Sequence, residues 1–314
     1  MWRLPALLAI AAALLAAQPA SADERLIAPE EAWDVSAYRG WVMWNTSDGP
    51  VLWRAGDARP FAPAGTGASG PQRARLGSDT RGRSAVSYLA CAEALERSRW
   101  RDCAVRQQRL AGGAPRTLLS AGDSNHVGVP EVWLGSLALS FVNTSTPAPR
   151  LQLFPPGRRA LRLTREAPFN VDMESGRLVY AGHREYAWPG FNTVARAIDL
   201  RGDKPRMHTL ARHDGEDEDG RTGATVVRLG SGATDGRYAY WVRTALSSSN
   251  SAYELWRADL SDPAATVRKA PLSGPVSSLA VNGGRIYCTG ESRGVYEITD
   301  PAWQDTGLRT PLRD

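Results

Sequence analysis

The feature that most constrains the fold of this chain is a short motif that recurs six times along its 314 residues. Each copy has a glycine, often followed by an arginine, and then a strand of alternating apolar residues that often ends in an aromatic residue. The clearest copy is Thr234–Trp241, which reads TDGRYAYW. The six glycines, spaced 41 to 60 residues apart, are Gly40, Gly82, Gly135, Gly176, Gly236 and Gly284. Such a period indicates a repeat architecture.

Each copy of the motif belongs to a unit of four short strands. A partner strand follows the motif, as at 254–260, and a short fourth strand follows a turn, as at 160–163. Another short strand precedes the glycine, as at 170–173. A β-sandwich also has many short strands, but it does not predict a four-strand unit repeated six times. The sequence therefore predicts an all-β fold, a six-bladed β-propeller of four-stranded antiparallel blades, with each glycine at positive φ in a tight turn.

The repeat resembles that of a known family. Asp235–Tyr240 together with Tyr253–Leu260 resembles the propeller repeat of TolB-like proteins, a WD40-like repeat, and 174–200 resembles it next best. The resemblance covers all six units at the level of the repeat. TolB-like proteins also carry an α/β domain before the propeller, whereas about ten residues separate the expected leader from the first blade here. We therefore expect the propeller alone, and a Tol–Pal role is not carried over.

The first 22 residues have the three parts of a secretory signal peptide. Arg3 supplies the positive charge, Leu4–Ala17 is almost wholly apolar, and Ala20–Ala22 offers small residues for cleavage. An apolar stretch of 14 residues is shorter than the roughly 20 needed to span a bilayer. We expect cleavage after residue 22, one mature propeller domain at 23–314, no membrane span, and a periplasmic or extracellular location.

Three cysteines remain in the mature chain, Cys91, Cys103 and Cys288. In an oxidising compartment we expect a disulfide between Cys91 and Cys103, which flank one loop. Closing a loop of this size contributes about 3 kcal/mol by the chain-entropy estimate. The state of Cys288 is left open. The cysteine and histidine spacings of zinc sites are absent.

The charge pattern does not favour a nucleic-acid ligand. The formal net charge of the chain is +5, and Lys204 and Lys269 are its only lysines. The arginines are spread along the whole chain, whereas a nucleic-acid binder concentrates them on one element. We interpret the arginines as residues on the solvent-exposed faces of the strands. Separately, we expect the protein to be a monomer.

In a propeller of such blades, short turns gather on one face of the ring and long connections on the other. The long set comprises 61–72, 90–102, 120–128, 143–149, 181–193, 211–222 and 244–252. Binding residues tend to lie on loops held by a rigid scaffold, so this long-loop face is the candidate site. Its candidate residues for binding a ligand or partner are Trp100, His126, His183, Arg184, Tyr186, Trp188 and His213. The alternative is that these loop side chains only cover the blade edges.

One long connection is strongly acidic. Its weak candidates for metal ligands are Asp214, Glu216, Asp217 and Asp219. Ca²⁺ prefers several oxygen ligands, but the glycine is not placed as in an EF-hand loop. Most such charge runs are solvated, so we expect no cofactor, with Ca²⁺ as the one alternative.

No catalytic motif is present in a convincing context. The nucleophile-elbow, zinc-protease, P-loop and dinucleotide-binding patterns are absent. Glycosidases with a propeller fold use a pair of carboxylate side chains for catalysis. The candidates for such a pair here are Glu131, Asp172 and Glu174. A carboxylate on an inner strand is equally suited to binding neighbouring backbone groups. The catalytic residues, if there are any, are therefore not assigned.

The sequence thus favours a non-enzymatic scaffold that binds a protein or peptide through the long-loop face. The alternatives are a carbohydrate-active or other hydrolase with acidic residues at the channel mouth, and a sensor of a ligand or metal. Ring closure is left open between two arrangements. Either 307–310 completes the sixth blade, or Arg25–Ile27 joins that blade as an N-terminal clasp.

Overall fold

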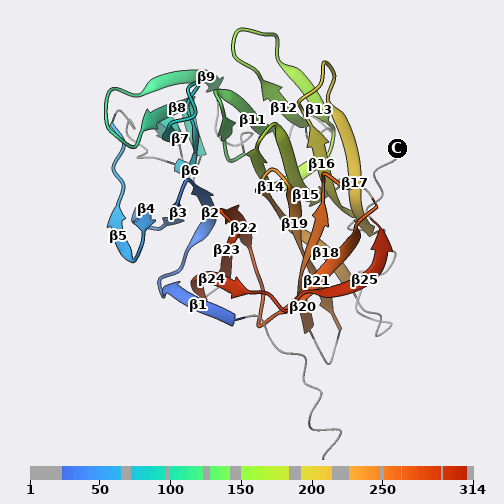
Figure 1. Cartoon of the computed structure of the whole chain (residues 1–314). Helices are drawn as coiled ribbons and strands as arrows, with labels where there is room; N and C mark the ends of the chain where they lie inside the picture. The colour runs from blue at the N-terminus through green and yellow to red at the C-terminus, as the bar shows by residue number, and fades with distance from the viewer. Residues whose placement is uncertain are drawn as a thin grey trace, which may run out of the picture.

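A computed structural model of the chain describes ten ranges of residues, which together carry the six blades. The ranges are 23–64, 72–95, 99–122, 128–141, 150–183, 192–213, 226–247, 251–262, 264–290 and 293–309. Within them, 25 strands form six sheets and no helix occurs. No membrane-spanning helix is therefore found in these ranges. The expected signal peptide, 1–22, lies outside them. Figure 1 shows the six sheets around a common centre.

Each sheet is one blade, and its strands follow one another in chain order except at the ends of the chain. Blade 1 comprises β2 (Trp33–Tyr38), β3 (Trp41–Thr46), β4 (Gly49–Arg54) and β5 (Asp57–Pro60). Blade 2 comprises β6 (Gln72–Ser78), β7 (Ser84–Leu95), β8 (Arg99–Arg109) and β9 (Arg116–Gly122). Blade 3 comprises β10 (Glu131–Trp133), β11 (Ser136–Phe141), β12 (Arg150–Phe154) and β13 (Leu161–Thr164).

The second half of the ring repeats this plan. Blade 4 comprises β14 (Ala167–Glu174), β15 (Arg177–His183), β16 (Thr193–Asp199) and β17 (Arg206–His213). Blade 5 comprises β18 (Val226–Thr234), β19 (Tyr238–Leu246), β20 (Ser251–Asp259), β21 (Thr266–Leu272) and β25 (Gln304–Arg309). Blade 6 comprises β22 (Ser278–Asn282), β23 (Arg285–Gly290), β24 (Gly294–Asp300) and β1 (Asp23–Ala28). The predicted six-bladed propeller is therefore confirmed, and the first strands β2, β6, β10, β14, β18 and β22 contact one another around the centre.

The glycine of each repeat lies in the turn between the first and second strands, as predicted. In blade 4 this turn is Ser175-Gly176, with φ of 51° and 73°. Two consecutive residues at positive φ make a type I′ turn, whose twist matches that of the flanking strands. The same pattern of positive φ occurs at Arg39-Gly40, Leu134-Gly135 and Gly283-Gly284.

The arginine of the repeat ties strands together. Arg177 donates hydrogen bonds from Nη1 to the carbonyl of Gly236 at 2.6 Å and from Nη2 to the carbonyl of Leu260 at 3.0 Å. Both acceptors belong to blade 5, so this arginine links two blades. In blade 5 the equivalent Arg237 instead pairs with Asp259 at the end of β20, at 3.1 Å. The repeated arginines are thus structural.

The ring is closed by the N-terminal strand. β1 pairs antiparallel with β24 as the outermost strand of blade 6, with Arg25 opposite Glu297. Figure 1 shows this blue strand beside the red one. Glu24 adds an ion pair to Arg293 at 2.9 Å. The clasp arrangement is therefore confirmed.

The other arrangement for ring closure is wrong. The outer edge of β24 is already occupied by β1, so the last strand lies elsewhere. β25 instead pairs with β21, where Thr266 is opposite Arg309, and it becomes a fifth strand of blade 5.

The hydrophobic core is divided among the six interfaces between neighbouring blades. Each cluster of buried side chains combines residues of two adjacent blades. Trp44 lies in the cluster between blades 6 and 1, and Trp241 in the cluster between blades 4 and 5, both with at most 1% exposure. Burying one large apolar side chain contributes about 2–3 kcal/mol, so stability depends on neighbouring blades staying in contact.

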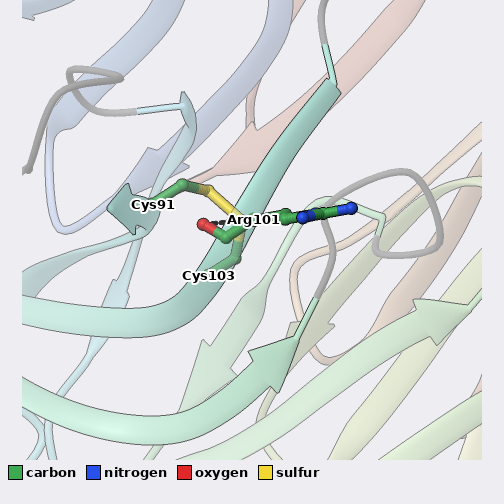
Figure 2. Close-up of a disulfide and its surroundings, with 3 residues drawn as sticks. All are labelled: Cys91, Arg101 and Cys103. Carbon is green, nitrogen blue, oxygen red and sulfur yellow. Dashed lines mark hydrogen bonds between the residues drawn. A yellow bond between two sulfur atoms is a disulfide. The ribbon is translucent and has the colours of Figure 1, made fainter. Parts of the chain in front are cut away.

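The predicted disulfide is present. Cys91 on β7 and Cys103 on β8 are directly opposite each other in the strand register, with Cα atoms 4.0 Å apart. Figure 2 shows the bridge between the two strands. Both residues are buried in the core between blades 2 and 3. Cys288, on β23, is buried and has a free thiol.

Candidate functional site

The direction of the strands assigns side chains to the two faces of the ring. The first strand of a blade runs from the long-loop face to the short-turn face, and the second strand returns. His183 is the last residue of β15 and His213 the last of β17, so both lie at the long-loop ends of blade 4. Trp33 begins β2 and Phe169 lies near the start of β14, at the same face.

Two of the predicted site residues, His183 and His213, are at matching positions on neighbouring strands of blade 4. Thr193, the first residue of β16, is opposite His183 on one side and His213 on the other. Residues opposite each other in antiparallel strands project from the same face of the sheet, and strands are about 4.8 Å apart. The two histidines therefore lie on one side of blade 4, about 10 Å apart at the backbone. The Thr193 hydroxyl accepts a hydrogen bond from the Leu229 amide at 3.1 Å, so this side faces blade 5.

His183 is uncharged near neutral pH. Its ring packs edge-on against Phe169, with ring centroids 4.6 Å apart. Burial lowers the pKa of His183, and the nearby charge of Arg228 lowers it further. A neutral imidazole beside an aromatic ring is suited to packing and hydrogen bonding rather than to binding an anion.

His213 lines a cavity between blades 4 and 5. The cavity has a volume of about 420 Å³, and its walls include Trp241, Trp256 and Leu308. Trp256 is half-buried and Leu308 is 56% exposed. The sequence alone does not connect these tryptophans to His213, because that contact needs blade 5 to lie against blade 4.

The remaining predicted binding and metal residues are not placed. His126, Arg184, Tyr186, Trp188 and the acidic residues Asp214, Glu216, Asp217 and Asp219 lie outside the described residues. Trp100 lies on β8, but its side chain is not described. Within the described ranges, no group of three or more histidine, cysteine, aspartate or glutamate side chains could hold a metal ion. The Ca²⁺ alternative stays a prediction.

Exposed aromatic side chains that the sequence analysis missed lie around the long-loop end of the axis. Trp33 is 41% exposed and Phe169 is 48% exposed. Blades 1 and 4 are opposite each other in a ring of six, so these two side chains stand on opposite sides of the axis. Two exposed arginines lie near the starts of inner strands, Arg73 on β6 and Arg228 on β18. This end of the axis therefore combines aromatic and cationic groups.

Below this rim, polar side chains fill the centre of the ring. Arg75 on β6 forms an ion pair with Glu131 on β10, from Nε to Oε2 at 3.0 Å, and it also donates to Asn170 on β14. Asn170 in turn donates to the hydroxyls of Ser231 on β18, at 3.4 Å, and Ser278 on β22, at 3.1 Å.

The sixth inner strand joins the same network through its backbone. The carbonyl of Val35 on β2 accepts from Arg75 at 3.4 Å. Arg75, Glu131, Asn170, Ser231 and Ser278 are at most 4% exposed. One polar cluster thus connects all six inner strands and closes the axis at this level. Arg75 lies in the middle of β6 and Asn170 in the middle of β14, and the sequence alone does not connect them, because their contact needs the ring to close.

The three carboxylates considered for catalysis lie close enough for their charges to act on one another. Burial raises the pKa of Glu131 well above its usual range, against the opposing charge of Arg75. Burial raises the pKa of Asp172 to about 6, and burial together with the charge of Asp172 raises the pKa of Glu174 to about 7. Asp172 accepts hydrogen bonds from the backbone amides of Thr234, at 2.7 Å, and Met173, at 3.0 Å. Asp172 therefore links blade 4 to blade 5.

Comparisons with known proteins assign no family to the chain. No family model and no curated protein matches the chain. Among solved structures, the chain is similar to the beta-propeller domain of the Trilobed protease from Pyrococcus furiosus. That match has 9% identity and a TM-score of 0.42, and it covers 90% of this chain and 98% of the other. TolB from Acinetobacter baumannii matches with 14% identity and a TM-score of 0.35, over 87% of this chain and 64% of the other. By its own strand order and repeats, this chain is a six-bladed β-propeller.

Proposed function

We propose that this propeller is an exported, non-enzymatic scaffold that binds a protein or peptide through its long-loop face. The observation that carries the proposal is the pair of exposed aromatic residues, Trp33 and Phe169, on opposite sides of the axis at that face. Tryptophan and other aromatic side chains contribute much of the binding energy at protein interfaces. Both residues belong to inner strands of the propeller, so their backbone positions are set by the ring.

Other features of blades 4 and 5 are compatible with such a surface. The cavity that His213 lines lies between the outer parts of blades 4 and 5, and the half-buried Trp256 is one of its walls. The polar cluster around Arg75 fills the axis beneath, so the rim overlies a closed floor at that level. A broad, aromatic surface of this kind suits a macromolecular partner.

Export is supported by two independent features. The leader pattern of residues 1–22 is that of a cleaved secretory signal. The buried Cys91–Cys103 disulfide is of a type that forms and persists in oxidising compartments. Expression of the full chain in a bacterium is expected to yield a periplasmic or extracellular product that begins at Asp23. A product that retains residue 1 in the cytoplasm would contradict export.

The binding role can be tested with the mature protein. Proteins captured from periplasmic and culture fractions on immobilised propeller are identified, purified and titrated by calorimetry. The expected result is that the double variant Trp33→Ala with Phe169→Ala binds at least about tenfold more weakly than the unmodified protein.

The matched control is Leu134→Ala. Leu134 is 39% exposed, but it lies in the turn between β10 and β11, on the short-turn face. This control is expected to bind normally. Unchanged affinity in the aromatic double variant, or equal losses in both variants, would show that the long-loop rim is not the binding surface.

A hydrolase is the second candidate, and one observation favours it. Asp172 and Glu174 lie two residues apart on β14, and both have raised pKa values, about 6 and about 7. Two carboxyl groups that titrate near neutral pH are the groups an acidic glycosidase needs. The hydrogen bonds of Asp172 to backbone amides favour a structural role instead. Hydrolysis of a glycan that is abolished by Asp172→Asn and by Glu174→Gln, in folded variants, would favour the hydrolase.

A further inference from the structure

A second surface, on the short-turn face, is built like a binding groove. A cavity of about 820 Å³ opens at the end of the interface between blades 3 and 4. Its walls come from the ends of β10 and β14 and from the turns that follow β12 and β16. These elements lie at the face opposite Trp33 and Phe169, so this groove is separate from the surface proposed above.

The floor of the groove is apolar. Trp133, Leu153, Met173 and Leu200 line it, and they belong to or pack against the core between blades 3 and 4. Leu161 lies on the wall and is 42% exposed. A large apolar side chain of a ligand would gain roughly 2–3 kcal/mol by covering such a floor.

The turns that form the walls of the groove are stiff. Pro155, Pro156 and Pro205 form the turns on either side, and proline has a fixed φ and no amide hydrogen. A wall of this kind is preorganised for its ligand. Together with the apolar floor, these walls favour a ligand with an apolar anchor.

The rim of the groove is cationic. Arg158 and Arg159 are exposed, and neither side chain has an ion-pair partner among the residues that the structure describes. Arg201 is held in place by Asp199, with Nε 2.9 Å from Oδ1. Asp203 is the one acidic residue of the lining, against these three arginines.

The turn beneath Arg201 explains why this rim can form. A Cβ atom at Gly176 would lie 2.6 Å from Cγ of Arg201, so only glycine lets the arginine stem lie across the turn. Gly176 also has a φ of 73°. The same glycine that makes the tight turn of the repeat thus shapes one side of the groove.

From this arrangement we propose that the groove between blades 3 and 4 binds an acidic peptide segment, with one aromatic or large aliphatic side chain on the apolar floor and carboxylates on Arg158 and Arg159. Guanidinium groups bind carboxylates through paired, charge-assisted hydrogen bonds. The inference goes beyond the proposed function, because it adds a second binding surface and states the chemistry of its ligand.

The test uses the mature protein and a fluorescein-labelled peptide of glutamate and aspartate residues around one central tryptophan. Fluorescence anisotropy is expected to show saturable binding that weakens with salt. Replacing the tryptophan of the peptide by glycine, or its acidic residues by glutamine, is expected to weaken binding by roughly tenfold or more. Equal binding of all three peptides would overturn the proposal.

Variants of the protein locate the site. Arg158→Ala with Arg159→Ala is expected to weaken binding of the peptide by about tenfold or more. The matched control is Arg162→Ala with Arg165→Ala, which removes two exposed arginines, one on β13 and one directly after it, that do not line the groove. Equal losses in both pairs, or no loss in the first, would overturn the proposal.

Two further controls separate this site from other occupants. The long-loop variant Trp33→Ala with Phe169→Ala is expected to bind the peptide normally, and loss of binding there would overturn the groove but not the proposed function. Sedimentation velocity is expected to show a monomer at the concentrations used. A dimer that dissociates in the Arg158, Arg159 double variant would mean that a second copy of the chain occupies the groove, which would overturn the proposal.

Discussion

The guanidinium of Arg75 lies 3.0 Å from the carboxylate of Glu131, and the two side chains are only 1% and 3% exposed. Arg75 comes from blade 2 and Glu131 from blade 3, so the pair joins two neighbours in the ring. Through Asn170 the same arginine reaches blade 4. An ion pair at the centre of the ring therefore helps to determine how the inner strands are arranged.

Replacing Arg75 is expected to be strongly destabilising. In Arg75→Met, the buried carboxyl of Glu131 and the side chain of Asn170 lose their donor, and each buried polar group left unsatisfied costs about 1–3 kcal/mol. Urea unfolding followed by tryptophan fluorescence measures the loss. The control is Arg237→Met, whose side chain is 64% exposed in its pair with Asp259 and whose loss is expected to cost much less. Similar losses in the two variants would contradict a structural role for the axial pair.

The stability of the protein is expected to fall as the pH rises from about 5 to about 8. The pKa of Glu174 is raised to about 7 in the folded protein, so the folded state keeps a proton that the unfolded state has already released. The free energy of unfolding therefore decreases through this interval. The lowered pKa of His183 contributes a slope of opposite sign, so a variant is needed to isolate the carboxyl.

Glu174→Gln supplies that comparison. At about pH 8 the variant is expected to be more stable than the unmodified protein by on the order of 1 kcal/mol, because glutamine carries no charge into the partly buried site. At about pH 5 the two proteins are expected to be nearly equal, because Glu174 is then protonated. Thermal unfolding at both pH values measures the difference, and an equal gap at both would rule out titration of Glu174 as its cause.

The disulfide is expected to stabilise the propeller, whereas the third cysteine is expected to be inert. Cys91→Ala with Cys103→Ala should lower the free energy of unfolding by about 2–4 kcal/mol, because the closed loop no longer restricts the unfolded chain.

Burial raises the pKa of the Cys288 thiol to about 12, so a thiol reagent should label it only after unfolding. Labelling of the native protein without reductant would contradict either the bridge or the burial of Cys288.

The two terminal strands are expected to differ in importance. Deleting 23–28 removes β1, which completes blade 6 and places Ala28 in the core between blades 6 and 1. Deleting 304–314 removes β25, a fifth strand whose residues are mostly exposed, together with the residues that follow it. Because only the first deletion opens the ring, it should lower the melting temperature more. Differential scanning calorimetry measures both, and a larger effect of the second deletion would contradict closure by the N-terminal strand.

The sequence by itself determined the blades. Alternating apolar residues, the glycine of each tight turn and the recurrence of the unit are local properties, so they could be recognised without a structure. Gly176 at a φ of 73° is where the repeat predicted a tight turn. The pairing of Cys91 with Cys103 was also predictable, because the two residues flank one hairpin.

Contacts between blades could not be predicted in the same way, and these decide the candidate sites. Arg75 and Glu131, or His213 and Trp241, are far apart in the chain and meet only when the ring has closed. Nothing in a single repeat shows whether a polar residue on an inner strand faces the axis. The edge left open on blade 6 likewise accepts either terminal strand by its hydrogen bonding alone. In the tertiary structure β1 pairs with this edge, because the packing of the ring places the N-terminal strand beside the free edge of β24.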